Sequence, residues 1–294
     1  MRIFVTGASG WIGSAVVPEL VAAGHEVLGL ARSDDAAKVV ADLGAQIHRG
    51  DLDDVDSLQR GAAACDGVVH LAYNHDFAHM AEAAQTDLAA IDAMGSALVG
   101  SGGPLLIASG VVGLAVGRVA TEADQPDPDS HPRVACASAA LAFAQRGVRP
   151  VIVRFPPTVH GPGDHGFIAT LVAIARERGA SGYVDDGANR WPAVHRADAA
   201  ALVRLAVDEA PAGAAIHATA EEGIAARTIA TAIGRGLGLP VTSVGRDDAA
   251  EHFGWIGRFF AADVPASSEA TQRLLGWTPT HAGLIDDLDA GHYF

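Results

Sequence analysis

The first hydrophobic positions predict a strand that leads through a glycine-rich turn into a helix. Residues 1–5 are mostly apolar, and residues 11–23 carry apolar side chains at helical spacing. Between these two segments Gly7, Gly10 and Gly13 form the pattern G-x-x-G-x-x-G. The chain therefore begins with a strand, turn and helix unit.

Further along, short apolar runs alternate with helical patterns, which is typical of a parallel sheet built from strand-helix-strand units. The predicted strands cover residues 26–31, 46–48, 67–72, 105–110, 151–154 and 214–217, and the predicted helices cover residues 36–43, 81–99, 133–146, 167–178 and 197–208. We predict an α/β fold, a Rossmann-type doubly wound parallel sheet with a smaller C-terminal substrate lobe. The domain that contains the glycine triplet and the sheet is expected at 1–155 with 191–218 returning to it, and the substrate lobe mainly within 156–294.

A glycine triplet between a strand and a helix favours a turn that holds the pyrophosphate of a dinucleotide. The first glycine allows a tight turn, the second lets a phosphate approach the backbone, and the third lets the helix pack on the sheet. An ordinary glycine-rich turn is the alternative. The expected cofactor contacts in this segment are Gly7, Ser9, Gly10, Trp11, Ile12 and Gly13.

The end of the second predicted strand bears on the choice of cofactor. An arginine at this place can pair with the 2'-phosphate of NADP, whereas an acidic residue binds the ribose hydroxyls of NAD. Arg32 and Ser33 favour NADP(H), while Asp34 keeps NAD(H) as an alternative. Asp51 and Leu52 fall where an adenine ring would lie.

Composition narrows the class of protein. The 294 residues are 49% hydrophobic, enough to bury the core of an enzyme, and the net charge of -15 argues against nucleic acid as a partner. No apolar run is long enough to cross a membrane. The two cysteines, Cys65 and Cys136, suit the reducing cytoplasm.

His75 and His79 have a spacing found in zinc sites, but no third ligand accompanies them, and we expect no metal.

Five segments together resemble the extended or atypical short-chain dehydrogenase/reductases, a superfamily that includes sugar-nucleotide epimerases. They are TGASGWIG at 6–13, HLA at 70–72, RFPPTVHGPG at 154–163, VHRADAA at 194–200 and the tail at 267–279. The resemblance covers nearly the whole chain. It implies a Rossmann-type sheet, a bound NAD(P) and a C-terminal lobe that closes over a small substrate. We expect Leu71, Ala72 and Pro156 at the cofactor as well.

The chain departs from this superfamily at its usual Tyr-x-x-x-Lys pair. The tyrosines and the single lysine are Tyr73, Tyr183, Tyr293 and Lys38. No tyrosine is therefore followed by a lysine four residues later. By the usual spacing from Arg154, Arg133 lies near the place of the lysine and Asp129 near that of the tyrosine. An arginine can hold a ribose or a phosphate, but it stays charged and does not relay protons.

Another group must then protonate or polarise a substrate carbonyl. Tyr73 is our first choice because it follows a central strand whose end opens onto the ligand crevice, with a pocket-lining role as the alternative. His75 and Asp76 can form a polar network beside it. Ser109 resembles the active-site serine of the superfamily, or else acts as a small spacer next to the cofactor. The predicted catalytic residues are Tyr73, His75, Ser109 and Arg133, and the predicted substrate-binding residues are Asp76, His160, Tyr183 and Trp191.

Three functions compete. The leading hypothesis is an NADP(H)-dependent oxidoreductase that moves hydride between nicotinamide and a small or medium carbonyl or alcohol. The second is a sugar-nucleotide epimerase or dehydratase, for which the basic groups at the diphosphate would be Arg176, Arg178, Arg190 and Arg196. The third is a catalytically silent NADP-sensing protein, suggested by the missing Tyr-x-x-x-Lys pair.

The alanine-rich helix at 81–99 is apolar on more than one face and predicts a homodimer.

Overall fold

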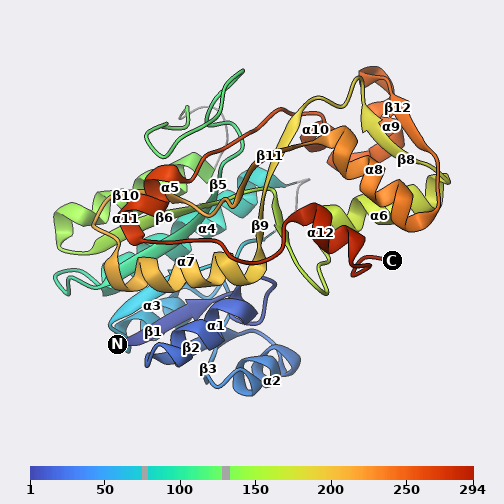
Figure 1. The fold of residues 1–294 in the computed structure, drawn as a ribbon. Helices are drawn as coiled ribbons and strands as arrows, with labels where there is room; N and C mark the ends of the chain where they lie inside the picture. The colour runs from blue at the N-terminus through green and yellow to red at the C-terminus, as the bar shows by residue number, and fades with distance from the viewer. Residues whose placement is uncertain (75–78, 128–132) are drawn as a thin grey trace.

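The computed structural model describes residues 1–74, 79–127 and 133–294. Its main feature is a seven-stranded sheet with the order β10-β6-β5-β4-β1-β2-β3, in which all neighbouring strands are parallel (Figure 1). The strands are β1 (Arg2–Thr6), β2 (Glu26–Ala31), β3 (Gln46–Arg49), β4 (Gly67–His70), β5 (Pro104–Gly110), β6 (Arg149–Phe155) and β10 (Ala214–His217). The strand order reverses between β1 and β4, so the predicted Rossmann-type doubly wound sheet is confirmed.

Successive side chains of each strand point to opposite faces of the sheet, and both faces are apolar. Ile3 and Val5 face one core, and Phe4 between them faces another. The first core is covered by α1 (Gly13–Ala22), α2 (Asp34–Asp42) and α7 (Arg196–Glu209). The opposite core is covered by α3 (Val55–Ala63), α4 (Met80–Ala97) and α5 (Arg133–Ala142). Each helix in the described part of the chain is too short or too polar to span a bilayer.

A further apolar core, which we call the second core, lies beyond the carboxyl ends of these strands and surrounds Trp191 and Phe260. Its helices stand to the right in Figure 1 and are α6 (Phe167–Arg178), α8 (Ala226–Leu237), α9 (Ala249–Phe253), α10 (Gly257–Phe260) and α12 (Leu284–Asp289). Two small sheets accompany them, with the orders β11-β9-β7 and β12-β8. Their strands are β7 (Thr158–His160), β8 (Ser181–Val184), β9 (Arg190–His195), β11 (Glu221–Ala225) and β12 (Val241–Val244).

Several element boundaries differ from the sequence-based expectation for local reasons. The helix expected at 36–43 begins at Asp34, because the Ser33 hydroxyl accepts a hydrogen bond from the Ala36 N–H and caps it. The helix expected at 133–146 ends as α5 at Ala142 and continues as a 3-10 turn, Phe143–Arg146. The five strands of the two small sheets were not predicted.

The C-terminal tail follows the short helix α11 (Glu269–Leu275). The buried carboxylate of Asp198 on α7 binds this tail. Asp198 accepts hydrogen bonds from the backbone N–H groups of Thr280 and His281 at 3.0 Å each, and from His281 Nδ1 at 2.8 Å. The Trp277 indole donates to the Asp198 carbonyl at 3.1 Å. The segment VHRADAA therefore joins the end of the chain to the central sheet.

Candidate functional site

The three glycines after β1 meet different constraints. Gly7 has a φ of +67°, and a Cβ on it would lie 2.7 Å from the Ala72 nitrogen. A Cβ on Gly13 would lie 2.0 Å from the Gly7 oxygen, so the fold itself requires both glycines. Gly10 is exposed, and its Cβ would meet only the Gly7 oxygen at 3.2 Å. The open side of Gly10 therefore fits a pyrophosphate that a side chain would displace.

At the start of α1 the N–H groups of Ser14 and Ala15 already donate to the Gly10 and Ile12 carbonyls, at 2.9 and 3.0 Å. No side chain caps this helix, whereas Ser33 caps α2 and Asp54 caps α3. The Ser14 hydroxyl, on the first turn, instead donates to the Gly10 carbonyl at 2.7 Å. An uncapped N-terminus with its N–H groups at a glycine loop is a suitable place for a phosphate.

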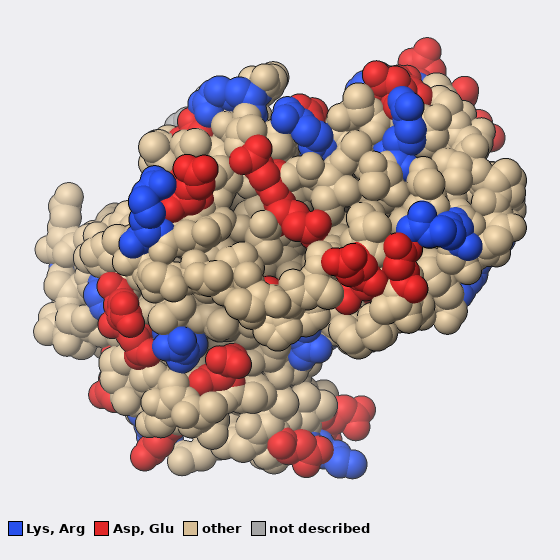
Figure 2. Space-filling view, in the orientation of Figure 1, with Lys and Arg blue, Asp and Glu red and all other residues tan. Residues whose placement is uncertain are grey.

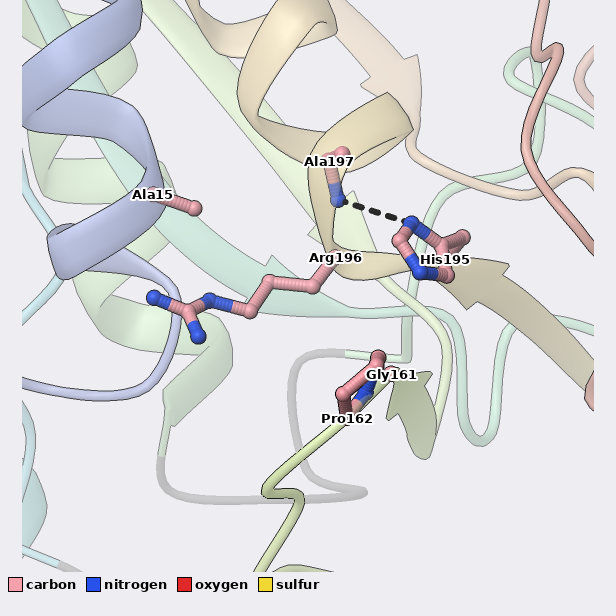
Figure 3. A pocket seen from close by; sticks show the side chains of 6 residues that line it. All are labelled: Ala15, Gly161, Pro162, His195, Arg196 and Ala197. Atoms are coloured by element: carbon pink, nitrogen blue, oxygen red, sulfur yellow. Dashed lines mark hydrogen bonds between the residues drawn. The ribbon is translucent and has the colours of Figure 1, made fainter. Parts of the chain in front are cut away.

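A pocket of about 180 Å³ adjoins the glycine loop, and Figure 3 shows the residues that line it: Ala15, Gly161, Pro162, His195, Arg196 and Ala197. Arg196 extends toward α1, where its guanidinium carbon lies 4.2 Å from the Trp11 ring centroid and its Nη2 donates to the Ser14 hydroxyl at 2.7 Å. The Trp11 indole donates to the Val159 carbonyl at 2.7 Å. These contacts hold the segment after β6 against the glycine loop. Of the predicted catalytic residues, the described ones, Tyr73, Ser109 and Arg133, do not line this pocket. We interpret the pocket as a gap between the part of the protein built on the central sheet and the part built on the second core.

The end of β2 presents one exposed arginine without a partner among the described residues. Arg32 is exposed and makes no ion pair there. Asp34, the acidic residue that kept NAD possible, pairs with Arg49 at 2.5 Å. Ser33 serves as the cap of α2, so its hydroxyl oxygen already accepts one hydrogen bond. Arg32 therefore keeps its charge available at the end of β2, whereas Asp34 is already engaged with Arg49.

Beyond the glycine loop, a buried hydrogen-bonded chain crosses from β1 through β4 to α4. Thr6 Oγ1 lies 2.6 Å from His70 Nδ1, and His70 Nε2 lies 3.0 Å from Asp87 Oδ1. His70 and Asp87 are only 1% and 2% exposed. Burial opposes ionisation of Asp87, but the hydrogen bond from His70 and the charge of Arg133 outweigh it, so the pKa of Asp87 lies below its ordinary value.

Arg133 links this buried chain to Tyr73. Its Nε lies 3.9 Å from Asp87 Oδ2, and its Nη2 donates to the Ala108 carbonyl of β5 at 2.9 Å. Its guanidinium carbon stands 3.8 Å from the centroid of the Tyr73 ring. Burial raises the pKa of the Tyr73 phenol, Arg133 opposes that rise, and Asp87 adds to it. The phenol therefore stays protonated and can donate a proton.

Among the predicted catalytic residues, the structure brings Tyr73 and Arg133 into contact, and Ser109 follows the residue of β5 that binds Arg133. Ser109 is half-buried at the carboxyl end of β5, directly after Ala108, whose carbonyl binds Arg133. The predictions that concern His75, Asp76 and Asp129 lie outside the described residues.

The remaining cofactor predictions fall at the ends of β3, β4 and β6, on the edge of the sheet where the glycine loop lies. Asp51 and Leu52 are half-buried just after β3. Leu71 and Ala72 are half-buried after β4, and Pro156 is buried after β6.

The predicted substrate residues beyond β6 take packing positions. His160 is fully buried and lies 2.6 Å from Asp287 Oδ2 through its Nδ1. Trp191 is 1% exposed, at the centre of the second core. Both side chains are buried by packing, so their role in substrate binding stays a prediction. Tyr183 is half-buried on β8, with the Arg227 guanidinium carbon 5.4 Å from its ring centroid.

Asp87 and the role of His70 were not predicted from the sequence. A signal was present, because the buried positions of α4 include Ala83, Ala84, Ala90 and Ile91, and Asp87 falls at helical spacing on that same face. A carboxylate on an otherwise apolar helix face needs a buried partner. That need points to a polar group on a neighbouring strand, and His70 supplies it.

With this geometry in hand, comparison with known proteins identifies the family. The model of the NAD dependent epimerase/dehydratase family matches residues 3–218. The chain belongs to this family. Its strand order, glycine loop and C-terminal core agree with the extended short-chain dehydrogenase/reductases, and its fold is that of an NAD(P)-dependent enzyme.

Individual relatives span a range of activities. The chain is 46% identical over 295 residues to "Uncharacterized protein C2A9.02" of Schizosaccharomyces pombe, and both chains are covered completely. It is 31% identical over 227 residues to the 2-alkyl-3-oxoalkanoate reductase of Stenotrophomonas maltophilia, covering 73% of this chain and 68% of that one. Among solved structures it is similar to DesIV, the dTDP-glucose 4,6-dehydratase of Streptomyces venezuelae with NAD and TYD bound, with a TM-score of 0.78 at 24% identity, covering 99% and 96% of the two chains. The last likeness shows the fold alone.

Proposed function

We propose that this family member is an NADP(H)-dependent oxidoreductase that transfers hydride between nicotinamide and a small or medium carbonyl or alcohol substrate. The observation that carries the proposal is the contact of Tyr73 with Arg133 at the carboxyl ends of β4 and β5, the edge of the sheet that also holds the glycine loop. The cofactor, when bound, supplies the hydride. Tyr73 supplies the proton to the substrate oxygen, and Ser109 is placed to orient that oxygen.

The residues at the cofactor would be the glycine loop at the pyrophosphate and Arg32 at the 2'-phosphate. Arg32 supports NADP because it has no ion-pair partner among the described residues, whereas Asp34 is paired with Arg49. A guanidinium and a phosphate form charge-assisted hydrogen bonds, and an unpaired arginine loses no existing partner on binding.

The arginines of the second core support a small carbonyl substrate over a sugar nucleotide. Arg190 forms a bidentate pair with Asp263, with contacts of 3.0 and 2.8 Å. Arg178 donates to the Glu251 carbonyl at 2.6 Å. These side chains would have to give up such contacts to bind a diphosphate. The relative that reduces 2-alkyl-3-oxoalkanoates, as its name says, provides a precedent for a ketone substrate within this family.

We further propose a homodimer through the outer faces of α4 and α5, which pack against each other. The exposed positions of α4 include the small or apolar residues Ala81, Leu88 and Ala89. Small residues let helices of two subunits approach closely.

Binding of nucleic acid is not proposed, because basic and acidic side chains are interspersed on the face shown in Figure 2 and the net charge is -15. The free thiols of Cys65 and Cys136 suit the cytoplasm.

A substrate screen tests the proposed function. Purified protein is mixed with NADPH and a panel of small ketones, β-keto acids and aldehydes, and the NADPH absorbance is followed. We expect turnover of at least one carbonyl compound. Nicotinamide that stays bound through purification, together with interconversion of a sugar nucleotide, would favour an epimerase, and NADPH binding without any turnover would favour a sensor.

A further inference from the structure

Asp87 is a buried carboxylate whose partners all belong to the proposed active site. It is 2% exposed in the middle of α4, and burying a charge is costly unless specific partners compensate for it. The buried Asp198 and Asp287 bind the C-terminal tail and His160, and so serve to join distant segments. Asp87 instead faces His70 and Arg133.

The contacts around His70 allow a continuous run of hydrogen bonds from Thr6 to Asp87. The Ala72 N–H donates to Thr6 Oγ1 at 3.3 Å, so the Thr6 hydroxyl is free to donate to His70 Nδ1 at 2.6 Å. His70 Nε2 then carries the hydrogen that it donates to Asp87 Oδ1 at 3.0 Å. With this assignment each of these contacts has one donor and one acceptor, and the Asp87 carboxylate is ionised. A fixed negative charge therefore lies beneath Arg133.

Within the described part of the chain, Asp87 and the Ala108 carbonyl hold Arg133 while its guanidinium rests against the Tyr73 ring. Asp87 lies 3.9 Å from Nε, and the Ala108 carbonyl lies 2.9 Å from Nη2. A cation this close to a tyrosine would by itself stabilise the phenolate. Here Asp87 offsets that cation, and the half-buried position of Tyr73 also opposes a charge on the ring.

We propose that the buried His70 and Asp87 pair keeps Tyr73 as a proton donor, so that the site works in the direction of carbonyl reduction. His70 and Asp87 are positioning residues, since they act through Arg133. This inference rests on the proposed function for its chemical meaning. Among the described residues, the titratable and charged groups that act on Tyr73 are Arg133 and Cys136 from α5 and Asp87 from α4.

The chemistry of reduction agrees with this arrangement. The carbonyl carbon gains the hydride of NADPH, and the electron pair of the C=O π bond moves to the oxygen. Tyr73 gives its phenolic proton to that oxygen, the product is an alcohol with oxidised cofactor, and the phenolate takes a proton back from water. Alcohol oxidation would require Tyr73 to begin as a phenolate, which Asp87 and burial both disfavour.

The test is to titrate Tyr73 itself, without substrate or cofactor. The protein is labelled at tyrosine Cζ with carbon-13, and the Tyr73 resonance, identified by its absence in Tyr73→Phe, is followed by NMR as the pH is raised from neutral. We expect Asp87→Asn to lower the midpoint by about 0.5 to 1 pH unit, and Arg133→Gln to raise it. Asp92→Asn, on the exposed side of the same helix, is the matched control and leaves the midpoint unchanged.

The two variants are expected to shift the Tyr73 midpoint in opposite directions, which keeps the inference falsifiable. If Asp87→Asn does not fold, Arg133→Gln still carries the test, because the Arg133 side chain is 24% exposed. An unchanged Tyr73 midpoint in a folded Asp87→Asn or Arg133→Gln protein would overturn the inference. The expected shifts without any NADPH-dependent turnover would leave the electrostatic coupling established and would contradict the proposed function alone.

Discussion

The guanidinium carbon of Arg133 lies 3.8 Å from the centroid of the Tyr73 ring, although the two residues are 60 positions apart in the chain (133 - 73 = 60). The contact is a cation–π interaction between α5 and the segment after β4. It provides a positive charge next to a phenol in a chain that has no tyrosine followed by lysine at the usual spacing. Arginine supplies that charge without a proton to exchange, which is why we propose the phenol as the proton donor of this site.

The glycine loop gives the first prediction. Gly10→Val should abolish NADPH binding in a folded protein, because the branched side chain would occupy the open side of the loop where we place the pyrophosphate. Binding is measured by isothermal titration calorimetry and folding by circular dichroism. Gly13→Ala is the contrasting variant and should fail to fold, since its Cβ would lie 2.0 Å from the Gly7 oxygen. Normal NADPH affinity in Gly10→Val would remove the loop from the cofactor site.

The second prediction concerns the choice between NADPH and NADH. Arg32→Ala should weaken NADPH binding by about 1 to 3 kcal/mol, the size of a lost charge-assisted hydrogen bond, and should barely change NADH binding. The test is to measure the dissociation constants of NADPH and NADH for the parent protein and for Arg32→Ala. Arg60→Ala removes an equal charge from α3, on the opposite face of the sheet, and serves as the control. Equal losses for NADPH and NADH in Arg32→Ala would contradict our assignment.

A third prediction tests the attachment of the C-terminal tail. Asp198→Ala removes the acceptor of three hydrogen bonds, two from backbone N–H groups that are left without it, and should lower the free energy of unfolding by about 3 kcal/mol. Urea denaturation followed by fluorescence measures the change. Asp286→Ala, at an exposed position of α12, should stay within about 0.5 kcal/mol of the parent. A similar small change in Asp198→Ala would show that the tail is held by other contacts.

The central sheet was predictable because its strands are short apolar runs bounded by helical patterns. The strand 67–72 and the helix 167–178 correspond to β4 (Gly67–His70) and α6 (Phe167–Arg178). The strands of the small sheets gave no such signal. They are three to six residues long, β8 contains Gly182, and β9 contains Pro192. Their pairing depends on contacts between distant segments, which local patterns do not record.

The candidate site was predictable only in part. Tyr73 and Arg133 followed from their positions near a strand end and near the place of the absent lysine, and the structure brings them together. Asp87 did not follow, because its partner on β4 is 17 residues away in sequence and the spacing alone names no partner. His160 was expected at the substrate but pairs with Asp287, a contact across 127 residues. Long-range pairing of polar groups decides these roles.

Substitution of the Tyr73 phenol tests the central claim most directly. Once the screen has given a carbonyl substrate, kcat and KM are measured for the parent and for Tyr73→Phe, which removes one hydroxyl and keeps the ring against Arg133. The account predicts a kcat lower by about 10²-fold or more with NADPH affinity unchanged. A Tyr73→Phe protein with the kcat of the parent would contradict it and would leave Ser109 or water as the proton source.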